Sequence, residues 1–191
     1  MAVIMEYETK QNRLLWLPSW QREIIARYPC LYLVPSRERA RHYAKFPEKR
    51  PPPEDYCNLR YGFECREGWA KLIEELSKIA TSLVRVLRAF GFQDDAEIAP
   101  VIVKEKIGTL RWQGDSNLLP PFRDLWNSFT ADIQHRSAFV CEISGYFGGL
   151  RDVGHGMLQT LSDAEYEKEL LRRAKRQSGR ESGPGGSGAA K

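Results

Sequence analysis

The sequence contains no apolar run near the roughly 18 residues that a membrane-spanning helix requires. Its first ten residues, MAVIMEYETK, bring in acidic side chains early and include no apolar stretch of the kind that marks a signal peptide. We therefore expect no membrane span and no signal peptide, and we expect the protein to work in the cytoplasm.

Cysteine is scarce, and neither sign of charge dominates. The four cysteines, Cys30, Cys57, Cys65 and Cys141, lack the close spacing of a disulfide framework, so reduced thiols are expected. The 29 basic and 25 acidic residues leave a net charge of +4. This mild excess permits contact with nucleic acid without requiring it.

Recognisable catalytic motifs are also missing. The glycine-rich segment 145–156 matches neither the dinucleotide fingerprint nor the phosphate-binding loop, and we expect no cofactor. The scattered carboxylates lack the spacing of an acid–base pair or of a hard-metal site. No catalytic residue is therefore assigned, and the sequence favours a protein that is not an enzyme. A nucleophilic pair formed by Cys141 and His155 is the enzymatic alternative.

What the sequence does contain is enough apolar material for one folded domain. Of its 191 residues, 42% are hydrophobic and 11% are aromatic. Residues 1–55 are predicted to form a helical and basic N-terminal arm that ends in a proline-rich linker. Residues 56–177 are predicted to form the compact domain, and residues 178–191 a disordered tail rich in glycine and serine.

The hydrophobic periodicity predicts an α+β fold, with long amphipathic helices packed on a small antiparallel β-sheet. The strongest signal is an i, i+3, i+4, i+7 apolar stripe from Trp69 to Phe90, with Gly91 placed as its C′ residue. Apolar and polar residues alternate over 97–115, which predicts a hairpin that turns at Gly108. Further helices are predicted over 20–28 with Ser19 as N-cap, over 120–137, and from Ser162 onward.

The last quarter of the chain holds an incomplete metal-binding pattern. Cys141, Ser144, Ser162 and Glu165 have the C-x2-C-x17-C-x2-C spacing of a structural zinc site, but only the first position is cysteine. A serine hydroxyl stays protonated where a thiol would ionise, so we predict that this frame binds no zinc. Ser162 and Glu165 are instead expected to form a capping box for the last helix.

Two further expectations concern this frame. Apolar side chains are expected to pack where a bound ion would otherwise hold the loop: Phe139, Tyr146, Phe147, Met157 and Leu161. The rival hypothesis is a different metal site, assembled from His155, Cys141, Cys57 and Cys65.

An ordered set of motifs resembles a family of small, largely uncharacterised bacteriophage and prophage proteins with a C-terminal zinc-knuckle-like motif. The matching pieces are Tyr28-Pro29, Gly62-Phe63-Glu64-Cys65, Gly68-Trp69, Lys104-Glu105-Lys106, Gly108, Leu110-Arg111-Trp112, Cys141-Glu142, Gly145, Gly148, Leu150-Arg151, Gly154 and Thr160-Leu161. The resemblance covers roughly residues 20–166. Family members usually carry further cysteines, or a histidine, where this chain has Ser144, Ser162 and Glu165. The resemblance implies a bacterial host cell and no known enzymatic activity.

Six residues are the candidates for contact with a partner: Lys104, Lys106, Arg111, Trp112, Arg151 and Trp16. Alternating basic residues beside a tryptophan are suited to an acidic partner or a phosphate backbone. A solvated strand face with cross-strand charge pairs is the alternative for the first three. Arg151 could equally bond to carbonyl groups of its own turn.

The sequence therefore suggests a phage- or prophage-encoded accessory protein that binds a host macromolecule. A host protein is the favoured partner, and the sharpest version is inhibition of a host defence or regulatory protein. The alternative is a nucleic-acid-binding module that uses the basic arm and tail. The sequence leaves the oligomeric state undetermined.

Overall fold

The computed structural model describes residues 13–51, 56–154 and 156–181, and it confirms the α+β fold. The main sheet has the order β1-β2-β3, with strands β1 (Phe63–Glu64), β2 (Ile98–Lys106) and β3 (Thr109–Ser116). The β2–β3 pair is the predicted antiparallel hairpin, and it turns at residues 107–108. The short β1 pairs parallel to β2, so the sheet is mixed rather than purely antiparallel.

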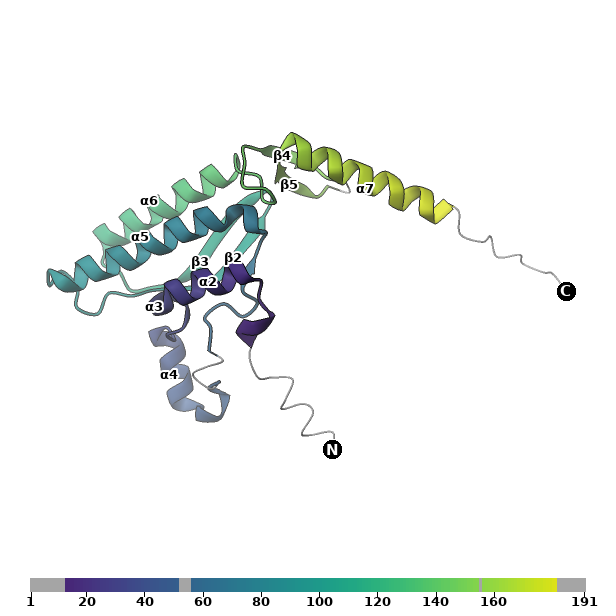
Figure 1. Ribbon diagram of the computed structural model, residues 1–191. Coiled ribbons are helices and arrows are strands. Elements are labelled where there is room, and N and C mark those ends of the chain that lie inside the picture. The colour runs from purple at the N-terminus through teal and green to yellow at the C-terminus, as the bar shows by residue number, and fades with distance from the viewer. Residues whose placement is uncertain (1–12, 52–55, 155, 182–191) are drawn as a thin grey trace, which may run out of the picture.

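Helices cover one face of this sheet (Figure 1). The long pair is α5 (Ala70–Ala89) and α6 (Pro120–Ser137), and α2 (Ser19–Arg27) and α3 (Pro29–Tyr32) lie beside α5. The predicted stripe of α5 supplies the core, with Trp69, Ile73 and Leu76 fully buried. The backbone at Gly91 has φ +66°, which confirms its predicted place after the helix.

Part of the predicted arm is packed into this core. Ile24 and Ile25 of α2, together with Leu31 and Tyr32, are buried in the same cluster as α5 and β2. Ser19 does not cap α2, because its side chain makes no capping hydrogen bond and Pro18 occupies the N-cap position. That prediction was wrong.

The rest of the arm lies on the surface. Helix α4 (Arg37–Lys45) buries none of its residues and is capped by the Ser36 hydroxyl, which accepts from the Arg39 N–H at 3.2 Å. Three short 3-10 helices complete the described elements of this part of the chain and its link to α5: Arg13–Trp16, Pro47–Lys49 and Glu67–Trp69.

A second, smaller unit follows α6. Strands β4 (Gly149–Asp152) and β5 (Leu158–Leu161) form an antiparallel hairpin, and α7 (Asp163–Glu181) extends from it away from the body (Figure 1). Cys141, Val153 and Leu161 form its small core. The last part of the predicted tail, residues 182–191, lies outside the described residues, whereas residues 178–181 belong to α7. No helix among the described residues combines the length and hydropathy needed to cross a membrane.

Candidate functional site

The incomplete zinc frame is assembled in space around Cys141. The Cys141 thiol is buried, and its Sγ accepts the backbone N–H of Ser144 at 3.4 Å. Burial alone would raise the pKa of this thiol. Hydrogen bonds from the Ser144 hydroxyl and from the backbone N–H groups of Ser144, Ser162 and Ile143 outweigh burial, and the pKa is lowered. Three of the four frame positions therefore converge on one sulfur atom.

Backbone hydrogen bonds hold the loop of this frame closed. The Cys141 N–H donates to the Tyr146 carbonyl at 2.7 Å, and the Gly145 N–H donates to the Cys141 carbonyl at 2.9 Å. The Glu142 N–H donates to the Thr160 carbonyl of β5 at 2.9 Å. The knuckle-shaped turn is thus held by the chain's own polar groups, because each of these strong donors and acceptors is paired within the loop or with β5.

The predicted capping box is half formed. The Ser162 hydroxyl accepts the Glu165 N–H at 3.4 Å, as expected for the start of α7. The Glu165 carboxylate does not return to Ser162 but accepts from the Lys168 ammonium at 2.6 Å. The backbone of Ser162 faces the Cys141 sulfur instead, where it helps to lower the pKa of that thiol.

The apolar packing predicted for this loop was wrong for four of its five residues. Tyr146 and Phe147 are 76% and 82% exposed, and Met157 and Phe139 are also exposed. Leu161 alone of the five is buried. Hydrogen bonds to Cys141 and the small core therefore hold the loop, and two large aromatic rings face solvent.

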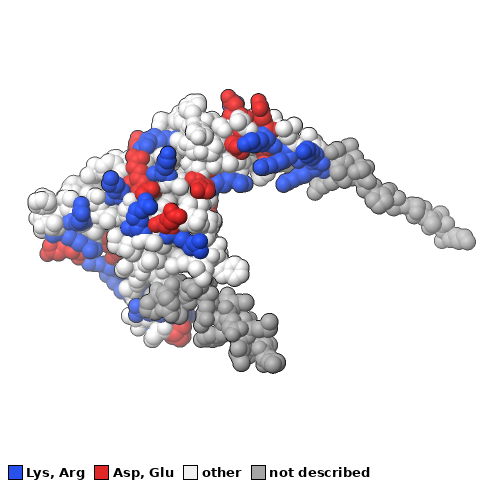
Figure 2. All heavy atoms as spheres, viewed as in Figure 1, with Lys and Arg blue, Asp and Glu red and all other residues white. Residues whose placement is uncertain are grey.

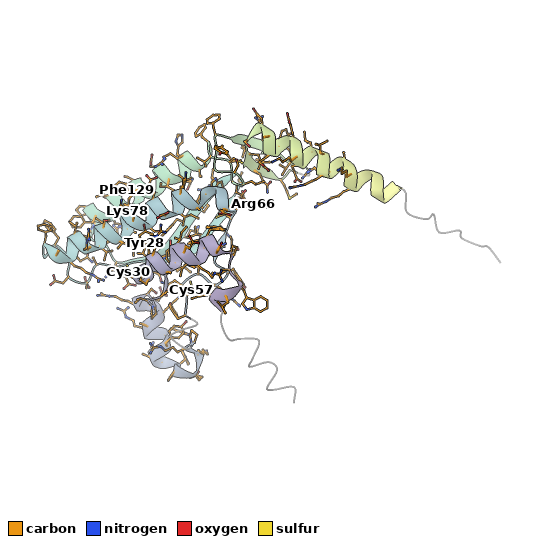
Figure 3. The ribbon with its side chains drawn as sticks, in the orientation of Figure 1. Tyr28, Cys30, Cys57, Arg66, Lys78 and Phe129 are labelled. Atoms are coloured by element: carbon orange, nitrogen blue, oxygen red, sulfur yellow. The ribbon has the colours of Figure 1, made fainter. Side chains whose placement is uncertain are left out.

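No three His, Cys, Asp or Glu residues among those described lie close enough to hold a metal ion. Cys57 and Cys65 pack against the main core, whereas Cys141 belongs to the smaller one. Figure 3 places Cys57 on the side of α2, distant from β4 and β5. His155 lies outside the described residues, so its pairing with Cys141 remains an untested prediction.

A buried carboxyl group lies where the smaller unit meets the main body. Glu142 is 3% exposed, and its Oε1 accepts the Arg66 N–H at 3.3 Å, while Oε2 is buried without a partner. Arg66 lies at this junction in Figure 3. Burial raises the pKa of Glu142, the Glu105 carboxylate raises it further, and Arg66 lowers it only in part. Burial, together with the Glu142 and Glu105 carboxylates, also raises the pKa of the Cys65 thiol to about 12.

Glu142→Gln is expected to raise the free energy of unfolding at pH 8 by roughly 1 kcal/mol, because the neutral amide removes a buried charge that Arg66 offsets only in part. The raised pKa of Glu142 means that this side chain favours folding when protonated and loses that contribution as pH rises through its folded-state pKa. The increase in the free energy of unfolding caused by Glu142→Gln should therefore shrink toward pH 4, where the Glu142 carboxyl group and the glutamine amide are both neutral. Urea unfolding at both pH values measures it, with the exposed Glu67→Gln as control. An equal effect at the two pH values would contradict the expectation.

The basic candidates lie on the sheet face opposite the helices. Lys104 is paired in register with Arg111, and Lys106 follows on the same side. None of the three forms an ion pair with a described residue. Lys106 is exposed and the other two are partly exposed. The cross-strand charge pairing offered as an alternative is therefore absent among the described residues. We call these three side chains the basic face.

Trp112 does not belong to the basic face. It pairs with Val103, whose side chain points to the helices, and its ring lies 6.1 Å from those of both Trp126 and Tyr32. Side chains alternate along a strand, so Trp112 and Arg111 must point to opposite sides. Trp112 borders a cavity of about 260 Å³ between β3 and α6. Among the described residues that line this cavity, Asp115 is the one acidic or basic side chain, so it offers no acid–base pair.

The two remaining candidates lie elsewhere. Arg151 of β4 forms an ion pair with Asp163 and lies over the Tyr166 ring, with 5.5 Å between its guanidinium carbon and the ring centroid. These contacts tie β4 to the start of α7, so Arg151 has a structural role through two side chains of α7 rather than through the carbonyl groups of its own turn. Trp16, near the start of the arm, is 79% exposed. The structure thus groups three of the six candidates into one surface.

Sequence reasoning did not predict the contact between the smaller unit and the main body at Glu142. Gly68 and Trp69 were noted as motif residues, but their contacts could not be read from spacing. The Gly68 N–H donates to the Glu142 carbonyl at 2.9 Å, and the Trp69 indole donates to the Val140 carbonyl at 2.7 Å. An adjacent glycine and tryptophan before a helix is a weak signal for such a close approach.

Comparison with known proteins gives no match. No protein-family model matches the chain, and searches of curated proteins and of solved structures also return none.

Proposed function

We propose that this protein is a phage- or prophage-encoded accessory protein that binds an acidic surface of a host protein through the basic face. The observation that carries the proposal is the grouping of Lys104, Lys106 and Arg111 on one sheet face, without ion pairs to described residues. Unpaired cations held on a rigid sheet attract and orient an acidic partner, which affects the association rate and specificity most strongly. The phage origin rests on the motif resemblance alone.

Contacts made by two arginines of the basic arm favour a protein partner over nucleic acid. Arg37 forms ion pairs with Asp95 and Glu97, and the Arg39 guanidinium donates to the Asn58 carbonyl at 2.8 Å. These two arginines therefore anchor α4 to the body and are less available for phosphate groups. Figure 2 shows acidic side chains over the first half of α7 and basic ones over its second half, so this helix too is mixed in charge.

The test is capture of a partner from bacterial lysate by the full chain, with and without nuclease. We expect one host protein to be retained after nuclease treatment. The Lys104→Gln, Lys106→Gln, Arg111→Gln variant should bind this protein at least about tenfold more weakly, which corresponds to about 1.4 kcal/mol. The matched control neutralises Lys45, Lys71 and Lys78, three exposed lysines on other surfaces.

Two outcomes would contradict this function. Equal binding by the basic-face variant and by its control would exclude the basic face as the contact surface. Capture that disappears on nuclease treatment, with affinity that falls steeply as salt rises, would favour the nucleic-acid-binding alternative.

A further inference from the structure

An exposed apolar patch lies at the end of the molecule where α5 stops and α6 begins. Phe90 is 73% exposed and Phe92 is 59% exposed, and their rings lie 6.4 Å apart. The Phe92 ring lies 5.9 Å from that of Phe122 in the first turn of α6. Val86, Leu119 and Leu125 extend the same surface and are 43%, 48% and 44% exposed. We call these six residues the phenylalanine patch.

The size of the phenylalanine patch exceeds what isolated surface residues produce. Taking about 150–200 Å² for a fully exposed large apolar side chain, the exposed fractions correspond to roughly 500 Å². Contiguous apolar patches of this size on soluble proteins commonly mark a contact surface. Two such patches face to face would bury about 1,000 Å², which is the lower limit for a specific protein interface.

The charges beside the patch are of both signs. Five exposed charged residues adjoin it in sequence and form no ion pair with a described residue: Arg85, Arg88, Arg123, Asp94 and Asp124. Three cations and two anions around an apolar centre fit a partner surface that itself carries both signs. A second copy of the chain has such a surface, because a two-fold contact places the same patch on both sides.

We propose that the phenylalanine patch is a self-association surface through which two copies of this chain form a two-fold symmetric dimer. The patch lies at the end of α5 and the start of α6, at the end of the molecule opposite the β4–β5 hairpin (Figure 1). The basic face reaches toward that hairpin, because Lys106 precedes the β2–β3 turn, where the Thr160 hydroxyl of β5 donates to the Gly108 carbonyl. A dimer formed there leaves both basic faces uncovered. It would present two copies of the proposed contact surface to a partner, so that a dimeric partner is held by two contacts at once.

Sedimentation equilibrium of the full chain tests the dimer. We expect a dissociation constant on the order of 10 μM, as befits an interface near the lower size limit. The Phe90→Ser, Phe92→Ser pair should raise this constant at least about tenfold, a loss of about 1.4 kcal/mol. The matched control is Tyr146→Ser, Phe147→Ser, which removes two aromatic rings that are even more exposed, at the other end of the molecule.

A second variant and the state of the wild-type chain complete the test of the dimer. A second variant, Leu125→Glu, places a charge in the patch on a different helix and should likewise give a monomer, while far-UV circular dichroism verifies that each variant is folded. A wild-type chain that stays monomeric at about 200 μM, well above the expected constant, would overturn the proposal. A dimer that survives the patch substitutions, or that the control pair weakens equally, would also overturn it. This test uses no host partner and is independent of the proposed function.

Discussion

Replacing Ser144, Ser162 and Glu165 by cysteine is expected to create a site that binds one zinc ion. The Cys141 sulfur already accepts a hydrogen bond from the Ser144 N–H, and the Ser162 backbone helps to lower the pKa of its thiol, so these positions converge before any metal is present. Structural zinc sites with four thiolates are tetrahedral and closed, and their apparent binding free energy is about 10–16 kcal/mol in small zinc domains. The fourth position follows one helical turn after Ser162, whose hydroxyl accepts the Glu165 N–H.

Without zinc, the substituted chain should be less stable than the wild type by about 1 kcal/mol, because the Ser162 cap of α7 is lost. Zinc at about 1,000 times its dissociation constant should stabilise the variant by about 4 kcal/mol and raise its melting temperature by roughly 10 °C. Metal analysis and thermal melts with and without chelator measure these effects. The control adds Cys141→Ser, which leaves three thiols in the frame and should abolish tight binding. If the variant with four frame cysteines binds no zinc, the frame positions do not converge.

Gly68→Ala is expected to separate the smaller unit from the main body and to lower the free energy of unfolding by roughly 3 kcal/mol. A Cβ at this position would lie 2.5 Å from the Glu142 carbonyl oxygen and closer still to that of Cys141. Both obstacles are backbone atoms, which cannot rotate away. The clash also displaces the hydrogen bond from the Gly68 N–H to Glu142.

Urea unfolding measures the loss, and hydrogen exchange of the Cys141 and Glu142 N–H groups locates it. Gly149→Ala is the matched control, because a Cβ there meets nothing within 4 Å. Its effect should stay within about 0.5 kcal/mol, as for most surface substitutions. If both variants lose the same stability, the contact between Gly68 and the frame is not what joins the two units.

Local pattern was a good guide wherever a residue's neighbours along the chain decide its environment. The stripe of α5, the turn of the β2–β3 hairpin and the placement of Gly91 all follow from periodicity and backbone preference. The sequence was a poor guide to Ser19, which begins α2 without capping it. Pro18 occupies the cap position instead, and capping residues of this kind are often displaced by a single position.

The candidate site shows a similar division. Alternation along β2 and β3 was enough to place Lys104, Lys106 and Arg111 on one side. The same alternation places Trp112 on the other side, so grouping it with the cations was an error that the strand pattern itself could have prevented. The burial of Glu142 left no trace in the sequence, because it depends on Arg66 and Gly68, which contact this residue but are distant along the chain.

The sequence by itself determined the α+β class, the helix and strand periodicities, and the spacing of the frame at Cys141, because these depend on interactions between residues close along the chain. Only the tertiary structure decided that Ile25 and Tyr32 of the arm complete the core, that the frame encloses a sulfur atom with N–H donors, and that Phe90 and Phe92 stay exposed. Each of these depends on which surfaces meet when distant segments pack. That outcome is set by the shape and volume of the whole core, and no local pattern encodes it.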